Sequence, residues 1–93
     1  MKFEWDDKKN AINIEKHGID FATAALVFSD LNRIEKYDIL HSEEEDRYIT
    51  IGEIAEVFVV VVVAYTERNE AIRIISARMA TKKEREVYYK WQR

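Results

Sequence analysis

Apolar residues in the first thirty positions indicate two helices, with an imperfect apolar stripe in the first and a regular one in the second. Asp6 can cap a helix over residues 7–17, and Gly18 stands where a left-handed backbone conformation would end that helix. Asp20 can cap a second short helix over residues 21–28. The apolar positions of this second segment have the i, i+3, i+4, i+7 spacing of one buried helix face: Phe21, Ala24, Ala25 and Phe28.

From residue 33 onward the apolar positions tend toward a period of two, which is typical of strands. Residues 57–66 are apolar on both faces, so they predict a central strand that is covered on both sides. Thr81 and Glu84 have the spacing of a capping box, which predicts a last helix that reaches about Trp91. The predicted strands cover residues 33–40, 47–52, 57–66 and 71–78.

The predicted order of elements is therefore helix, helix, four strands, helix. Because short connections join successive strands, the sheet should be a mostly antiparallel meander packed on its helices, which places the fold in the α+β class. A chain of 93 residues can bury a core without metal or disulfide crosslinks. We expect one domain over residues 1–93.

The composition is compatible with a reducing aqueous compartment. The chain has no Cys, which excludes disulfides and thiolate metal sites. Its longest apolar run covers residues 57–65, whereas a helix needs about eighteen apolar residues or more to cross a bilayer. The first seven residues lack the apolar region of a secretory signal. We expect a cytoplasmic protein that does not contact a membrane.

The net charge of −3 is unevenly distributed along the chain. Residues 1–46 hold six Lys or Arg against twelve Asp or Glu, whereas residues 47–93 hold nine against six. A polyanion such as RNA would therefore bind the second half of the chain. The acidic first half could equally attract a basic protein partner.

Four arginines in the second half carry the strongest candidate chemistry: Arg47, Arg68, Arg73 and Arg78. Guanidinium groups can bind phosphate oxygens in pairs, although most such charges are simply solvated or paired with carboxylates. Arg73 and Arg78 are five residues apart, so a regular strand would point them to opposite faces. Both could serve one site if a bulge lay between them or if Arg78 lay past the strand end, and we expect the latter.

The histidines, the glycines and Glu67 bear on whether the site holds a metal, a cofactor or a proton-transfer group. The only histidines, His17 and His41, have no metal-ligand spacing, and the two glycines form no phosphate-binding loop, so neither a metal nor a cofactor is expected. His17, at a helix end, could transfer protons or serve as a cap. Glu67 could be a general base or a salt-bridge partner of Arg68. His41 lies in an acidic turn and is expected at the surface.

Additional RNA contacts are predicted from lysines and aromatic residues. Aromatic rings can stack on unpaired bases, although rings at helical spacing more often belong to the core. The predicted RNA-binding residues are Lys16, Tyr65, Tyr88 and Lys82.

Short motifs follow one another along nearly the whole chain. They include Phe3-Glu4-Trp5-Asp6, Lys16-His17-Gly18, Tyr65-Thr66-Glu67-Arg68 and Arg73-Ile74-Ile75-Ser76-Ala77-Arg78. In the order and spacing of these motifs the chain resembles the BrnT family of toxins from bacterial type II toxin–antitoxin pairs, which look like RelE-type ribonucleases.

The resemblance implies a RelE-like fold and a cytoplasmic, metal-independent endoribonuclease that arrests translation. In such nucleases the neighbouring 2′-hydroxyl attacks the scissile phosphate, so the protein must supply a base, an acid and cationic stabilisation. The implied roles are phosphate binding by Arg68 and Arg78, assistance by Arg47 or Arg73, and proton transfer by His17 or Glu67.

The resemblance also implies partners. The first is a BrnA-like antitoxin with a ribbon-helix-helix end, so that the toxin would meet DNA only through this antitoxin. The second is the RNA substrate. We expect the antitoxin to cover apolar sheet surface that three short helices leave open. The alternative is a non-catalytic binding module, a degenerate toxin that acts with its antitoxin in transcriptional autoregulation, and the acidic net charge is compatible with it.

Overall fold

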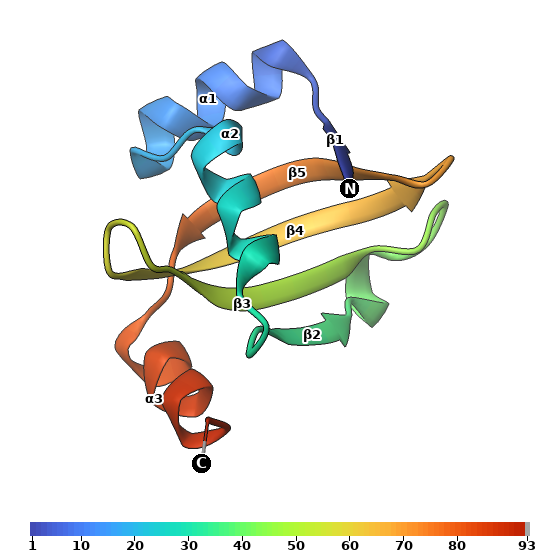
Figure 1. The fold of residues 1–93 in the computed structure, drawn as a ribbon. Coiled ribbons are helices and arrows are strands. Elements are labelled where there is room, and N and C mark those ends of the chain that lie inside the picture. Colours follow the sequence, from blue (N-terminus) through green and yellow to red (C-terminus); the bar gives the residue numbers. More distant parts are fainter. Residues whose placement is uncertain (93) are drawn as a thin grey trace.

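The computed structural model describes residues 1–92 and is built on one five-stranded sheet (Figure 1). The strands are β1 (Lys2–Glu4), β2 (Ile34–Tyr37), β3 (Tyr48–Ile54), β4 (Val59–Arg68) and β5 (Ala71–Met79). The helices are α1 (Asp7–His17), α2 (Phe21–Ala24) and α3 (Lys82–Lys90), with 3-10 turns η1 (Ala25–Ser29) and η2 (Ile39–His41). The spatial order is β1-β5-β4-β3-β2, and only the β1–β5 pair is parallel.

The expected α+β fold with a mostly antiparallel sheet is confirmed. The expected order of elements is wrong at its beginning, because β1 precedes the first helix. A three-residue strand is too short to show a period of its own. It is fixed by parallel pairing with β5, in which Phe3 lies opposite Ile72.

The predicted caps of the three helices are confirmed. The Asp6 carboxylate accepts hydrogen bonds from the first-turn backbone of α1, and Gly18 has a φ of 70° at its end. Asp20 caps α2, and the capping box of Thr81 and Glu84 is complete in α3. Three boundaries are wrong. The second helix tightens into η1 after Ala24, and the strand expected over 33–40 ends at Tyr37 and passes into η2. The strand expected over 57–66 lies two residues later, as β4.

The central position and double burial of β4 are confirmed. On the first face of the sheet, Val61 and Val63 are fully buried under α2 and η1 (Figure 1). On the second face, Val60 and Val62 pack with Ile51 and with Tyr88 of α3. Alternate residues of one strand thus enter two separate cores.

A bulge in β5 decides which arginines share a face. Ala64 of β4 pairs with Ser76, but the next residue, Tyr65, pairs with Ile74, so Ile75 is the extra residue. The bulge restores Arg73 and Arg78 to the same, second face. The expectation that Arg78 lies past the strand end is wrong, because Arg78 pairs with Val62 inside β5.

A single side chain closes the exposed edge of β5. β1 covers only the beginning of this edge, and beyond it the Asn13 side chain of α1 donates to the carbonyl oxygen of Ala77 and accepts from its backbone N–H, at 2.8 and 3.1 Å. Asn13 also donates to the carbonyl oxygen of Ile19 at 2.9 Å and is buried. The amide therefore replaces a neighbouring strand and fastens α1 to the sheet.

We predict that Asn13→Ala lowers the free energy of unfolding by about 3 kcal/mol, because it leaves several buried backbone groups without partners. Asn32→Ala is the matched control, since the Asn32 side chain is exposed and makes no hydrogen bond within residues 1–92. Urea unfolding of both variants measures the difference. Equal stability of the two would contradict the role given to Asn13.

The ion pair that holds α3 to the sheet generates a pH prediction. Hydrogen bonding to Arg78 lowers the pKa of Glu84 to about 2. A carboxyl group whose pKa is lowered by folding stabilises the protein above its ordinary pKa near 4.5, and this stabilisation disappears as the pH falls toward 2.

Glu84→Gln should therefore lower stability by about 2 kcal/mol at pH 7, and the difference from the wild type should shrink between pH 4.5 and pH 2.5. Denaturant unfolding at several pH values measures it. Glu86→Gln is the control on the same helix, because Glu86 is exposed and has no ion pair among the described side chains. A difference that stays constant with pH would contradict the assignment.

Candidate active site

The second face of the sheet is open at the end away from α3. In Figure 1, α3 lies at the lower left, whereas the β4–β5 hairpin and the chain leading into β3 lie together at the right. A groove of about 450 Å³ lies there, within the size range of ligand sites. The groove residues used below are Lys9, His41, Glu45, Arg47, Thr66, Arg68 and Arg73.

Two polar groups in the groove have no partner. The Arg47 Nε and the Thr66 Oγ1 are buried and make no hydrogen bond to any described residue. Thr66 is only 2% exposed. Nearly all buried polar groups in proteins are paired, often with a buried water, so these two orphan atoms mark a polar environment beside the groove. Arg47 Nε can only donate, whereas the Thr66 hydroxyl can donate or accept.

Two other arginines of the groove already bind carboxylates. Arg68 binds Glu45 through two hydrogen bonds, from Nε to Oε2 at 2.6 Å and from Nη2 to Oε1 at 2.7 Å. The bond from Arg68 lowers the pKa of the Glu45 carboxyl. Arg73 Nη1 lies 3.0 Å from Glu4 Oε2. In the unbound protein both Arg68 and Arg73 are therefore paired with carboxylates, as the simple alternative predicts.

The Arg68–Glu45 pair nevertheless marks the geometry of a phosphate contact. A carboxylate held by both arms of a guanidinium occupies the place that two phosphate oxygens would take. The side chains are 50% and 34% exposed, and exposed ion pairs are weak. The pair therefore contributes little to stability, and its guanidinium group is accessible from the groove.

Arg78 lies outside the groove. It shares the second face with Arg73, but it lies at the end covered by α3, where it binds Glu84 through two hydrogen bonds of 2.7 and 2.9 Å. Arg78 lies five positions after Arg73, which, with the bulge between them, is about 13 Å along β5. The pair joins β5 to the first turn of α3, so its role in this structure is to position that helix.

The predicted proton-transfer groups also lie elsewhere. His17 is exposed at the end of α1 and is absent from the groove lining. Glu67 is exposed and pairs with Ile72 of the first face, so its side chain points away from the groove. Lys16 and Lys82 are exposed on α1 and α3, and neither lines the groove.

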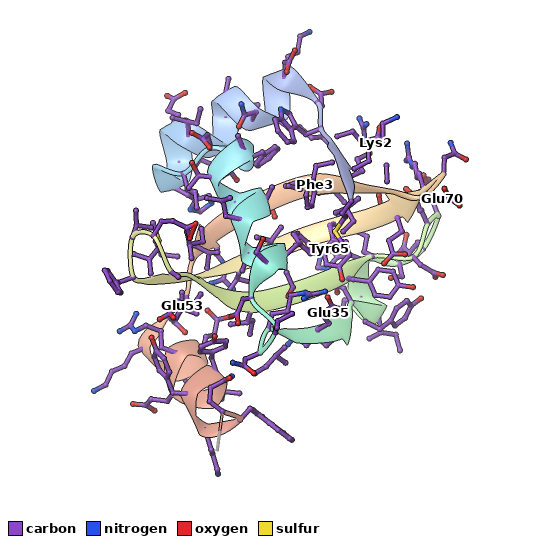
Figure 2. All side chains as sticks on the ribbon, in the orientation of Figure 1. Lys2, Phe3, Glu35, Glu53, Tyr65 and Glu70 are labelled. Atoms are coloured by element: carbon purple, nitrogen blue, oxygen red, sulfur yellow. The ribbon has the colours of Figure 1, made fainter. Side chains whose placement is uncertain are left out.

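The two tyrosines predicted to stack on bases are buried. Tyr65 is 2% exposed, with its ring against Tyr48 and Phe28 on the first face of the sheet (Figure 2). Burial raises the pKa of Tyr65 to about 12. Tyr88 is 4% exposed and its hydroxyl donates to Asp30. Both rings belong to the core, so the prediction of stacking is wrong for the structure as it stands.

Sequence reasoning missed His41, which lines the groove. Its Nδ1 lies 2.9 and 3.1 Å from the two carboxylate oxygens of Asp38. The i, i+3 spacing of these residues was the available signal. The strand predicted over residues 33–40 conceals this signal, because in the structure η2 begins directly after Asp38. Lys9, from the first turn of α1, was also missed, since nothing in the sequence places it beside β4.

Two further observations concern metal ligands and membrane-spanning helices. Within residues 1–92, no three His, Asp or Glu side chains gather in a way that could hold a metal ion. Among the described helices, none has the length and apolarity required to cross a membrane.

Comparison with known proteins identifies the family. No curated protein matches the chain. A family model described as "Ribonuclease toxin, BrnT, of type II toxin-antitoxin system" matches residues 5–84. This segment includes α1, the whole groove and the first turn of α3, so the match covers most of the fold as well as the candidate site. The chain therefore belongs to the BrnT family of ribonuclease toxins of type II toxin–antitoxin systems.

Proposed function

We propose that this protein is an endoribonuclease that binds the scissile phosphate of RNA in the groove between the β4–β5 hairpin and the chain leading into β3. The observation that carries the proposal is the cluster of cationic side chains around one groove: Lys9, Arg47, Arg68 and Arg73. Among the described residues Arg47 has no ion-pair partner, so a phosphodiester supplies the anionic oxygens that its guanidinium group can bind.

The proposed reaction needs no metal. The 2′-hydroxyl of the RNA attacks the neighbouring phosphorus, and the developing negative charge is stabilised by fixed cations. Arg47 provides the first contact, Arg68 exchanges Glu45 for the phosphate, and Arg73 and Lys9 add positive charge at the rim. Arg78 is left out of this constellation, since it is paired with Glu84 at the far end of the sheet.

The proposed biological setting follows from the family. The protein acts in the cytoplasm, arrests translation by cutting RNA, and has the RelE-like arrangement of such toxins. A BrnA-like antitoxin with a ribbon-helix-helix end neutralises it and provides the contact with DNA. The apolar sheet surface that was expected to stay open is buried, since none of the residues Val60 to Val63 is more than 7% exposed. Exposed apolar side chains for such a partner occur instead at the β3–β4 turn, where Phe58 is 84% exposed, and just after α3, where Trp91 is 73% exposed.

A second candidate function is a non-catalytic module that binds its antitoxin and aids repression. The observation that favours it is that Arg68 and Arg73 are already neutralised by Glu45 and Glu4, within a chain of net charge −3. Such a module would bind its partner but cut no RNA. Cleavage by the purified protein therefore separates the two functions.

We predict that Arg47→Ala lowers the RNA cleavage rate by about two orders of magnitude or more, because loss of one preorganised charge donor removes roughly 3 to 4 kcal/mol of transition-state stabilisation. Arg47→Lys should restore little, since Lys lacks the planar fork. Cleavage of a labelled RNA by each purified variant measures the effect.

Two arginine controls accompany this experiment. Arg85→Ala removes an arginine on α3 outside the groove and should cleave at the wild-type rate. Arg78→Ala should unfold more easily but cleave normally at temperatures where it remains folded. A large loss of cleavage in folded Arg78→Ala, with none in Arg47→Ala, would move the site to the other end of the sheet.

We predict that chelation with EDTA leaves cleavage unchanged, because the proposed charge stabilisation comes from arginine and lysine side chains. The products should end in a 2′,3′-cyclic phosphate or a 3′-phosphate, which mass spectrometry distinguishes from a 5′-phosphate product. Cleavage that stops with EDTA and returns with Mg²⁺ would contradict the mechanism.

A further inference from the structure

The proposed cleavage requires a group that removes the proton of the 2′-hydroxyl, and few groove residues are suited to this. The arginines and Lys9 are assigned to charge stabilisation in the proposed function. The carboxylates of Glu43, Glu44 and Glu45 also line the groove. Carboxylates are ordinarily weaker bases than an imidazole. His41 also lines the groove, and histidine is the side chain that most readily exchanges protons near neutral pH.

The hydrogen bonds of His41 leave one ring nitrogen available. Its Nδ1 lies within 3.1 Å of both carboxylate oxygens of Asp38, whose side chain is only 10% exposed. An Nδ1–H donated to this carboxylate leaves the lone pair on Nε2. The His41 side chain is 61% exposed, so Nε2 can be reached by a substrate in the groove.

The same network holds the imidazole and Arg47 together. Asp38 N donates to the carbonyl oxygen of Arg47 at 2.8 Å, and Arg47 N donates to Ser42 Oγ at 2.9 Å. Ser42 Oγ in turn donates to the carbonyl oxygen of Asp38 at 2.6 Å. These hydrogen bonds close the segment from Asp38 to Arg47 into one loop. The loop therefore fixes the position of His41 relative to Arg47. A proton acceptor and a phosphate-binding arginine need this kind of fixed relation.

We propose, on the basis of the function proposed above, that His41 is the general base of RNA cleavage and that Asp38 is its positioning residue. Nε2 of His41 takes the proton from the 2′-hydroxyl while the bond from O2′ to phosphorus forms and the bond from phosphorus to O5′ breaks. The leaving O5′ takes a proton from water. The imidazolium then returns its proton to solvent, which closes the proton balance.

The contrasting interpretation is a surface ion pair that merely fastens η2. An exposed i, i+3 pair of this kind contributes little to stability and nothing to chemistry. The two interpretations differ in their effect on rate and on binding, because a general base contributes to the chemical step but not to affinity for RNA.

The test uses the full-length protein and a labelled single-stranded RNA, with single-turnover cleavage and RNA binding measured separately. His41→Ala should lower the cleavage rate about a hundredfold or more, with RNA affinity within a few-fold of wild type. Added imidazole should restore part of the rate, because the exposed site admits the free base. Asp38→Asn should lower the rate about tenfold without rescue by imidazole.

His17→Ala is the matched control, since His17 is the other histidine of the chain and lies outside the groove. It should cleave at the wild-type rate. Thermal unfolding shows whether each variant is folded. Wild-type cleavage by folded His41→Ala, or a rate loss that imidazole does not reverse, would overturn the assignment while the proposed function stands. A wild-type protein that cleaves no RNA would overturn both.

Discussion

The burial of β4 on both faces is the constraint on which the rest of the structure depends. Val61 and Val63 require a layer on the first face, and Val60 and Val62 require one on the second. The helices before the sheet supply the first layer, but only α3 is available for the second. Because α3 covers the half of β4 where the valines lie, the other half is left open, and there the strand turns polar at Thr66. The groove is thus the part of the sheet that the helices cannot cover.

Two structural features position arginines at this uncovered end of the sheet. The bulge at Ile75 aligns Arg73 with the second face, and the closed loop from Asp38 to Arg47 fixes Arg47 beside Thr66. The bulge is a backbone feature, whereas the loop is closed by backbone hydrogen bonds and by the Ser42 side chain. The glutamates of the groove partly neutralise these cations in the unbound protein. In the proposed function a phosphate binds there by exchange with a carboxylate, which gives weaker binding than a bare cationic groove would.

The positions of the four candidate arginines could be predicted only in part from the sequence. The sequence marked all four as candidates, and Arg47, Arg68 and Arg73 do line the groove. Arg78 stands in the same sequence motif as Arg73, but it does not line the groove. Its carboxylate partner is Glu84, six residues further along the chain, which also completes the capping box of α3. Both Arg78 and its partner were visible in the sequence, but their contact depends on where α3 turns back against the sheet. Similarly, Asp38 and His41 were visible, but the assignment of a strand there concealed their contact.

The sequence by itself determined the features that depend on neighbouring residues: the caps at Asp6, Asp20 and Thr81, the left-handed Gly18, the hairpin arms, and the two-sided β4. Capping, turn formation and alternation act over a few residues, so the chain encodes them locally. Only the tertiary structure decided the parallel pairing of β1, the bulge in β5, and the meeting of Lys9, His41 and Arg47 in one groove. These features depend on contacts between residues far apart in sequence, and such contacts leave no period or spacing that a single chain reveals.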